Sequence, residues 1–284
     1  MISIILILLF VFSVLSVPVC HGVISGLYLY GMKIFPGLFI SFILTNILVR
    51  ILQQKNINNP WILVITGLMT GFPNGAYICS WYNKNNPENR LGDMLAGIIN
   101  IPSPAFLISY VYINILEKCI SLPMFLALTY TPVILCSYMA ILFFRDKDNK
   151  KDNAPHIKND KKLIFHFFEE AVDSSINTAL TLGAYVIIFS VIVNIIMHFS
   201  QSNTAGLLIS YLFEISNGLA IIKNAGIPMN TTVLLTVLLD AFGGVCIIMQ
   251  TKSICSSYIS IKKYIYQKLV LCIVCLLYTS PSPR

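Results

Sequence analysis

Long apolar runs constrain the fold of this chain more than any other feature of its sequence. A helix needs about 20 apolar residues to cross the hydrocarbon core of a membrane, which is about 30 Å thick. Five runs reach that length, at residues 2–20, 34–52, 91–116, 122–144 and 176–199, and weaker runs follow at 206–222, 229–250 and 264–278. Because the runs are continuous rather than alternating, they favour helices over the strands of a membrane barrel. The sequence therefore predicts an all-α, polytopic membrane protein, a helical bundle of about 7–9 hydrophobic segments.

The composition agrees with this class of protein. Hydrophobic residues make up 56% of the chain and charged residues 11%, whereas an ordinary soluble domain has about 25% charged residues. No lysine or arginine precedes Lys33, so the first run lacks the basic segment of a secretory signal peptide, and we expect residues 1–29 to contain a retained transmembrane helix. The cysteines show no metal-ligand spacing and are interpreted as small core residues.

The basic residues concentrate in one polar stretch, RDKDNKKDNAPHIKNDKK, which begins at Arg145. Under the positive-inside rule this stretch predicts a cytoplasmic linker at residues 145–163, and its interleaved aspartates favour a solvated connection over a nucleic-acid surface. We expect the linker to separate two weakly similar halves, residues 30–144 and 164–278. The last residues, 279–284, read TSPSPR, which is typical of translated adapter sequence, and we expect them to be a non-native tail.

Helix-breaking residues interrupt several apolar segments, most clearly in GLMTGFPNGAYI at residues 67–78 and also in INIPSPAFLI and LDAFGGVCI. Proline removes a backbone donor, glycine admits unusual backbone angles, and such backbone persists at membrane depth only where protein or a water-filled cavity satisfies it. The expected breaks are at Gly71, Pro73, Gly75, Pro102, Pro104, Gly243 and Gly244. Paired, broken segments in two halves are typical of transporters and channels built from repeats, with broken or re-entrant helices around a site near the bilayer midplane.

The charges around the first break indicate how it lies in the membrane. A full span at residues 61–81 would place Arg50 and Lys55 outside the cell, against the positive-inside rule. A re-entrant hairpin that enters and leaves on the cytoplasmic side keeps both residues on the same side as Lys84 and Arg90. We therefore expect this segment to be a hairpin that does not cross.

Six motifs occur in a characteristic order over residues 30–275: FPGLFISFIL, GFPNGAYI, INIPSPAFLI, LGAYVIIFSVIVNII, LFEISNGLAII and LDAFGGVCI. In this order they resemble the YlbJ family of sporulation integral membrane proteins, which belongs to the nucleoside-recognition, or gate, domain group. The resemblance implies a membrane protein of an endospore-forming Firmicute that acts in cortex assembly or spore maturation. The gate domain implies kinship with nucleoside transporter cores, but it establishes no substrate and no binding residues.

Two acidic residues lie well inside apolar runs, Glu214 and Asp240. A charge at the bilayer centre costs about 2.5 kcal/mol or more, so each acid should face the bundle interior and be neutralised, protonated or used in function. We expect the two acids to line one polar pocket for a solute or ion, together with Asn217, Asn74, Asn100 and Ser103. In the alternative interpretation, Glu214 is protonated and bonded to a neighbouring helix, and the asparagines cap broken helices.

No sequence motif supports enzyme chemistry, since the four histidines are scattered and no nucleophile elbow, zinc-protease motif or P-loop occurs. We expect no catalytic residue, metal or cofactor. Two functions remain open: a transporter- or channel-like protein for a small polar solute or ion, and a non-transporting scaffold that recruits sporulation machinery through residues 145–163. The expected partners are the lipid bilayer and that solute or ion, with no nucleic acid, and the expected location is the bacterial cell membrane.

Overall fold

The computed structural model describes residues 2–55, 59–87, 90–145, 161–200, 204–255 and 258–279. Every regular element within these ranges is a helix, and no strand occurs in them, which confirms the all-helical part of the prediction. Most of the expected linker, residues 146–160, and the end of the expected tail, residues 280–284, lie outside the described residues.

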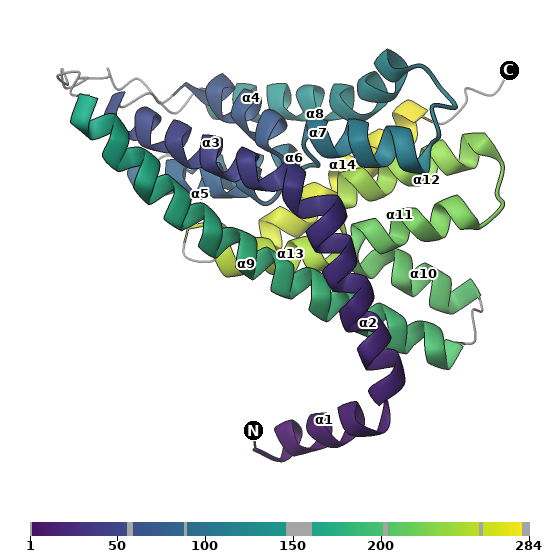
Figure 1. Cartoon of the computed structure of the whole chain (residues 1–284). Coiled ribbons are helices and arrows are strands. Elements are labelled where there is room, and N and C mark those ends of the chain that lie inside the picture. Colours follow the sequence, from purple (N-terminus) through teal and green to yellow (C-terminus); the bar gives the residue numbers. More distant parts are fainter. Residues whose placement is uncertain are drawn as a thin grey trace, which may run out of the picture.

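The N-terminal part of the chain forms a bent helical path (Figure 1). Its elements are α1 (Ile2–Val14), α2 (Ser16–Tyr28), the π-helix η1 (Leu29–Ile34) and α3 (Phe35–Lys55). The chain leaves the helical path at Leu15, so the apolar run at residues 2–20 does not form one continuous helix. A second bend, of 61°, separates α2 and η1 from α3.

The order of the remaining elements repeats. The first pass begins with the long helix α3 and continues with α4 (Pro60–Thr70), α5 (Asn74–Asn85), α6 (Leu91–Ile99), α7 (Pro104–Phe106), the π-helix η2 (Leu107–Ile115) and α8 (Leu122–Arg145). The second pass consists of α9 (Lys161–Ser200), α10 (Thr204–Phe213), α11 (Ile215–Asn224), α12 (Met229–Phe242), α13 (Gly244–Cys255) and α14 (Ile261–Thr279). Each pass thus contains a long helix, two short helices, a broken helix and a final long helix.

The two short helices of each pass form a hairpin, whereas the broken helix runs on past its break. α4 packs against α5, and α10 packs against α11. In contrast, α6, α7 and η2 continue as one apolar path, Leu91–Ile115, and α12 and α13 as another, Met229–Cys255. Helices of 11 and 12 residues, such as α4 and α5, are each shorter than a membrane is thick, since a helix rises about 1.5 Å per residue.

Four helical paths of the described residues are long and apolar enough to cross a membrane: Leu91–Ile115, Leu122–Phe143, Phe168–Ser200 and Met229–Cys255. The bent path through α2, η1 and α3 would be a fifth. The described residues therefore support four or five spans, and the predicted count of 7–9 hydrophobic segments is not confirmed. Two physical reasons account for the difference: the run at 206–222 is divided at Glu214, and α14 carries three lysines, Lys262, Lys263 and Lys268. The long apolar helices remain compatible with a multi-pass membrane protein.

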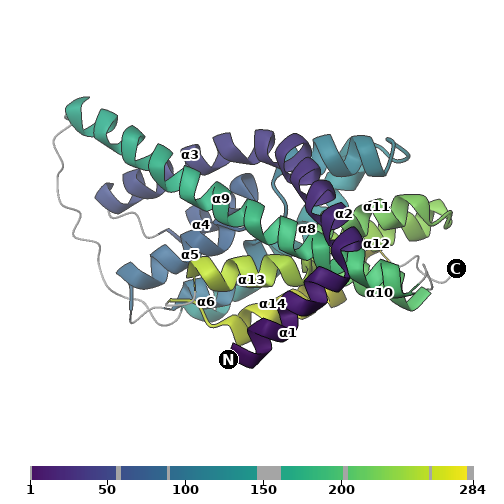
Figure 2. The ribbon, with the colours of Figure 1, turned by 60° about the horizontal axis from the view of Figure 1, so that its bottom comes forward.

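The two ends of the bundle differ in their number of basic residues, and Figure 2 shows that α3 ends and α9 begins at the same end. At one end Arg50 near the end of α3 pairs with Glu170 in the first part of α9, and Arg90 donates to the carbonyl oxygen of Tyr258. The basic side chains at this end are Arg50, Lys84, Arg90, Lys252, Lys262 and Lys263. At the opposite end Lys223 pairs with Glu117 at 2.7 Å. We refer to the first as the basic end of the bundle.

The two hairpins begin at opposite ends of the bundle. The α4–α5 hairpin follows α3 at the basic end and returns there at Lys84, whose ammonium lies 5.9 Å from the ring of Tyr258. α9 starts at the basic end and runs the length of the bundle, so the α10–α11 hairpin begins at the far end and returns there at Lys223. The second pass of elements therefore runs in the opposite direction to the first.

Candidate functional site

The tip of the first hairpin lies directly against the break of the first broken helix. Gly71 ends α4 with φ +72°, and a Cβ added there would come within 2.7 Å of the Cβ of Ser103. The backbone N–H of Phe72 donates to the carbonyl oxygen of Ile101 at 3.0 Å. A glycine is needed at position 71 because of both its backbone angle and this close approach.

The tip of the second hairpin lies against the second break in the same way. Gly243 ends α12 in the left-handed conformation, and Gly244, also with positive φ, begins α13. A Cβ added to Gly244 would lie 3.2 Å from the carbonyl oxygen of Leu212 and 3.3 Å from that of Phe213, at the end of α10. Each hairpin tip thus contacts the break of the broken helix in its own pass.

Two half-helices start at these breaks with side-chain caps. The hydroxyl of Ser103 accepts a hydrogen bond from the N–H of Phe106 at 3.3 Å and caps the half-helix formed by α7 and η2. The carboxylate of Glu214 accepts a hydrogen bond from the N–H of Asn217 at 2.7 Å and caps α11. Helix N-termini leave N–H groups without partners inside the helix, and the Glu214 side chain supplies an acceptor for one of them.

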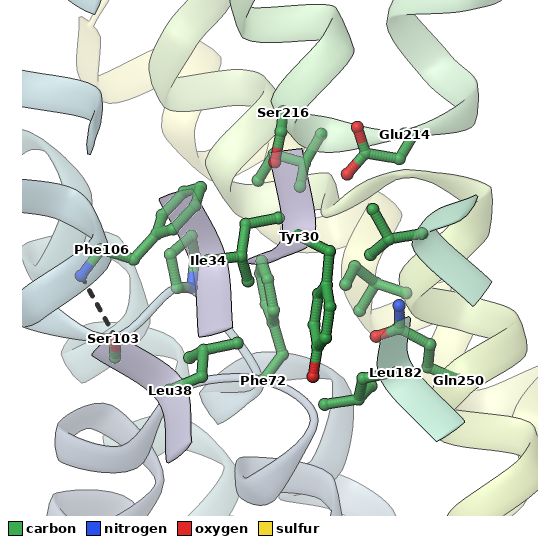
Figure 3. A pocket seen from close by; sticks show the side chains of 14 residues that line it. Tyr30, Ile34, Leu38, Phe72, Ser103, Phe106, Leu182, Glu214, Ser216 and Gln250 are labelled. Atoms are coloured by element: carbon green, nitrogen blue, oxygen red, sulfur yellow. Dashed lines mark hydrogen bonds between the residues drawn. The ribbon is translucent and has the colours of Figure 1, made fainter. Parts of the chain in front are cut away.

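A cavity of about 30 Å³ lies where these elements meet (Figure 3). Its lining includes Tyr30, Phe72, Ser103, Glu214, Ser216 and Gln250, which come from η1, both hairpin tips, the first break and α13. Figure 3 shows Glu214 and Ser216 at one edge, Ser103 and Phe106 at the other, and Tyr30 between them. The volume suits one water molecule or one small ion, whereas a pocket for a drug-sized molecule has about 300 Å³ or more.

Of the predicted site residues, only Glu214 and Ser103 line this cavity. The amide of Asn74 donates to the hydroxyl of Thr45 at 3.4 Å, in the contact between α5 and α3. Asn217 donates to Ser190 at 3.2 Å and lines a separate, more open cleft of about 340 Å³ together with Asn194. The structure does not bring the six predicted residues into one pocket, because the asparagine side chains join neighbouring helices.

Asn100 joins three elements beside the first break. Its side-chain oxygen accepts from the N–H of Ala76 at 3.2 Å, and its amide nitrogen donates to the hydroxyls of Thr251 at 3.2 Å and Tyr264 at 2.8 Å. These bonds link α5, α13 and α14 to the end of α6. Asn100 therefore holds the two passes of the fold together at the level of the breaks.

Asp240 is fully buried in α12, and neither carboxylate oxygen has a hydrogen-bond partner among the described residues. The side chains of Tyr130 on α8, Tyr211 on α10 and Cys275 on α14 lie within electrostatic range of its carboxyl group. The hydroxyls of Tyr130 and Thr236 are likewise buried without a partner in the part of the chain that the structure describes. Unsatisfied buried polar groups are costly, so this cluster needs a proton, a water molecule or an ion to be stable.

Two charged residues that the sequence reasoning missed also lie in the core. Lys268 of α14 is fully buried, and its ammonium donates to the backbone carbonyls of Asn100 and Ala241. The sequence signal was present, since Lys268 interrupts the apolar run at residues 264–278. Asp93, in the first turn of α6, accepts hydrogen bonds from the amide of Asn83 and the N–H of Ser260.

The fold and these contacts define a helical protein with long apolar helices, two hairpins and two broken helices that meet around buried charged groups. No protein-family model, no curated protein and no solved structure matches the chain. Among the described residues, no group of three or more histidine, cysteine, aspartate or glutamate side chains is arranged to hold a metal ion.

Proposed function

We propose that the protein is a transporter- or channel-like integral membrane protein that moves a small polar solute or an ion during bacterial endospore formation. One observation carries the proposal: the tips of both hairpins, the break of the first broken helix and α13 of the second broken helix line one cavity, and Glu214 is part of that lining. Irregular backbone and a buried carboxylate at membrane depth are costly, and in membrane proteins they mark solute and ion pathways.

The inverted order of the two passes supports a transporter. Many transporters consist of inverted repeats, and their sites lie between the repeats, where broken helices present N-termini to the solute. Here the half-helices that begin after Ser103 and Glu214 belong to different passes and start at the same cavity. Rocking of one pass against the other would alter this cavity and would expose it to one side of the membrane at a time.

The location and orientation belong to the same proposal. The basic end of the bundle, where Lys84 and Lys263 lie, is the cytoplasmic end under the positive-inside rule. The second hairpin begins and ends at the opposite side. The broken helix α12–α13 then brings the chain back to the cytoplasmic end, where Lys252 lies, so that both hairpins fit the rule. The family resemblance supplies the bacterial membrane and the role in spore formation.

The size of the cavity favours an ion or a very small solute in this conformation. A volume of about 30 Å³ admits one water molecule or one small ion, and a nucleoside would require the hairpin tips to separate. The carboxylate of Glu214 would neutralise a cation, and its cap position keeps one helix terminus oriented toward the cavity.

Complementation of a deletion strain of an endospore former tests the proposal. Glu214→Gln keeps an oxygen that accepts from the N–H of Asn217 but removes the charge, so we expect normal membrane abundance and loss of heat-resistant spores. Glu117→Gln is the matched control, because Glu117 lies in an exposed connection where a hydrogen bond from Lys223 lowers the pKa of its carboxyl. Full rescue by Glu214→Gln would contradict a role of this carboxylate in transport.

The second candidate function is a scaffold that recruits sporulation machinery through residues 145–163. The observation in its favour is the concentration of charge in that stretch. Replacing residues 146–160 with a glycine and serine linker of equal length separates the two functions: a transporter tolerates the replacement, whereas a scaffold loses rescue. A comparison of metabolites between wild-type and deletion forespores would then identify the solute.

A further inference from the structure

The ammonium group of Lys268 lies at the meeting point of the two broken helices. The side chain is 0% exposed, and its Nζ donates hydrogen bonds to the carbonyl oxygen of Asn100 and, at 3.0 Å, to that of Ala241. The ring of Tyr264 lies 5.8 Å from Nζ, within the range of a cation–π interaction. In the part of the chain that the structure describes, no carboxylate forms an ion pair with Lys268.

Both carbonyl groups belong to the C-terminal ends of half-helices. Asn100 is the C-cap of α6, and Ala241 lies in the last turn of α12, which ends at Gly243. The last carbonyls of a helix lack partners within the helix and together carry about half a negative charge. Lipid offers these oxygens no donor, so the protein has to supply one. Two negative helix ends therefore converge on a single positive group.

The carbonyl oxygens at such helix ends are suitable ligands for a cation. Where transporters have broken helices, unwound carbonyls and the C-terminal ends of half-helices coordinate the coupling cation. The carbonyls of Asn100 and Ala241 are neutral oxygen ligands, which suit a cation of single charge. A lysine ammonium is a compact charge with three donors on a flexible stem, and here two donors face carbonyls and the third side faces an aromatic ring.

We propose that Lys268 is a tethered cation: its ammonium fills a monovalent-cation site formed by the carbonyl ends of α6 and α12. The protein needs no free alkali ion at this position, and removal of the amine turns the position into a site for Na⁺ or K⁺. The proposal does not depend on transport, because it rests on the two helix ends and not on the cavity beside Glu214.

Thermal unfolding of the purified full chain in detergent tests this inference. The variant Lys268→Ala is compared with the wild type in NaCl, KCl and N-methyl-D-glucamine chloride at equal ionic strength. A ligand that binds only the folded state raises Tm, so we expect Na⁺ or K⁺ to raise the Tm of Lys268→Ala by about 3 °C or more, with saturation. Any alkali gain of the wild type belongs to the cavity beside Glu214, and it is subtracted from the gain of Lys268→Ala.

Two control variants make the result specific. Lys268→Met fills the same space without a charge and leaves no room for an ion, so its alkali gain should equal that of the wild type. Lys262→Ala removes an exposed lysine from the same helix and should behave like the wild type. The proposal is overturned by a Tm of Lys268→Ala that is equal in the three salts, by an equal alkali gain in Lys268→Met, or by failure to recover folded Lys268→Ala in any salt.

Discussion

Gly71 and Ser103 lie so close together that the tip of the first hairpin and the break of the first broken helix share one packed contact. A Cβ at Gly71 would lie 2.7 Å from the Cβ of Ser103 and 2.8 Å from its Cα, and Gly71 has φ +72°. Neither partner can move freely, because Ser103 caps the following half-helix and Phe72 is bonded to Ile101. The contact couples the position of the hairpin to the position of the break.

Gly71→Ala should therefore destabilise the protein. A side chain in the left-handed region costs about 1–3 kcal/mol, and the contact with Ser103 adds to this cost, so we expect Tm to fall by about 4 °C or more. Gly31→Ala is the matched control, because a Cβ there meets nothing within 4 Å and φ is not positive. Thermal unfolding followed by tryptophan fluorescence measures both variants, and an equal Tm for Gly71→Ala and the wild type would argue against the contact.

Asp93 links the start of α6 to the connection before α14, and its removal should also destabilise the protein. Its side chain is 1% exposed and accepts from the N–H of Ser260 at 3.0 Å, while Arg90 and Lys263 pair with the second oxygen. Asp93→Ala leaves buried donors without partners, at a cost of about 1–3 kcal/mol. The exposed Asp173→Ala serves as the control. Equal Tm values for the two variants would show that the Asp93 contacts contribute little.

The breaks with proline and glycine could be predicted from the sequence, because these residues act locally on the backbone. Gly71 and Gly243 end helices, and Pro104 begins one. The break at Glu214 could not be recognised in this way, since LFEISNG has no proline or glycine at the break itself. There α10 ends because the side chain of Glu214 caps the next helix, α11. The sequence does not show this hydrogen bond, because it depends on the backbone angles at Glu214.

The site could be predicted only in part for a related reason. Burial cost alone identified Glu214 and Asp240 as acids that need a partner or a function. The partners themselves depend on contacts between residues far apart in the sequence, such as Lys268 with Asn100, which are separated by 168 positions. Polar residues in apolar runs were therefore recognised as unusual, but their grouping into one pocket could not be tested without the fold.

The topology of the first hairpin leads to a labelling prediction. In a variant without native cysteines, single cysteines at positions 55 and 84 should both be protected from an impermeant thiol reagent outside the cell, because the α4–α5 hairpin returns to the basic end, which we propose to be cytoplasmic. A cysteine at position 118, in the exposed connection before α8, should be labelled from outside. Strong external labelling at position 55 without labelling at position 84 would refute the hairpin.

Asp240→Asn gives the most direct test of a coupling role in the core. Neither carboxylate oxygen of Asp240 has a hydrogen-bond partner among the described residues, so the substitution breaks no bond that the structure shows and removes only the charge at nearly constant shape. We expect membrane abundance and Tm to be retained, since the substitution breaks no bond and keeps the shape of the side chain.

If Asp240 carries a proton or holds an ion during transport, the same variant should fail to restore heat-resistant spores in a deletion strain. Thr236→Val, one helical turn earlier, provides the comparison: it removes a buried hydroxyl that also lacks a partner within the described ranges and cannot carry a charge. Loss of rescue in Asp240→Asn with normal abundance, and rescue by Thr236→Val, would assign the function to the carboxyl group. Normal spores from Asp240→Asn would show that a neutral side chain suffices and would exclude Asp240 from coupling.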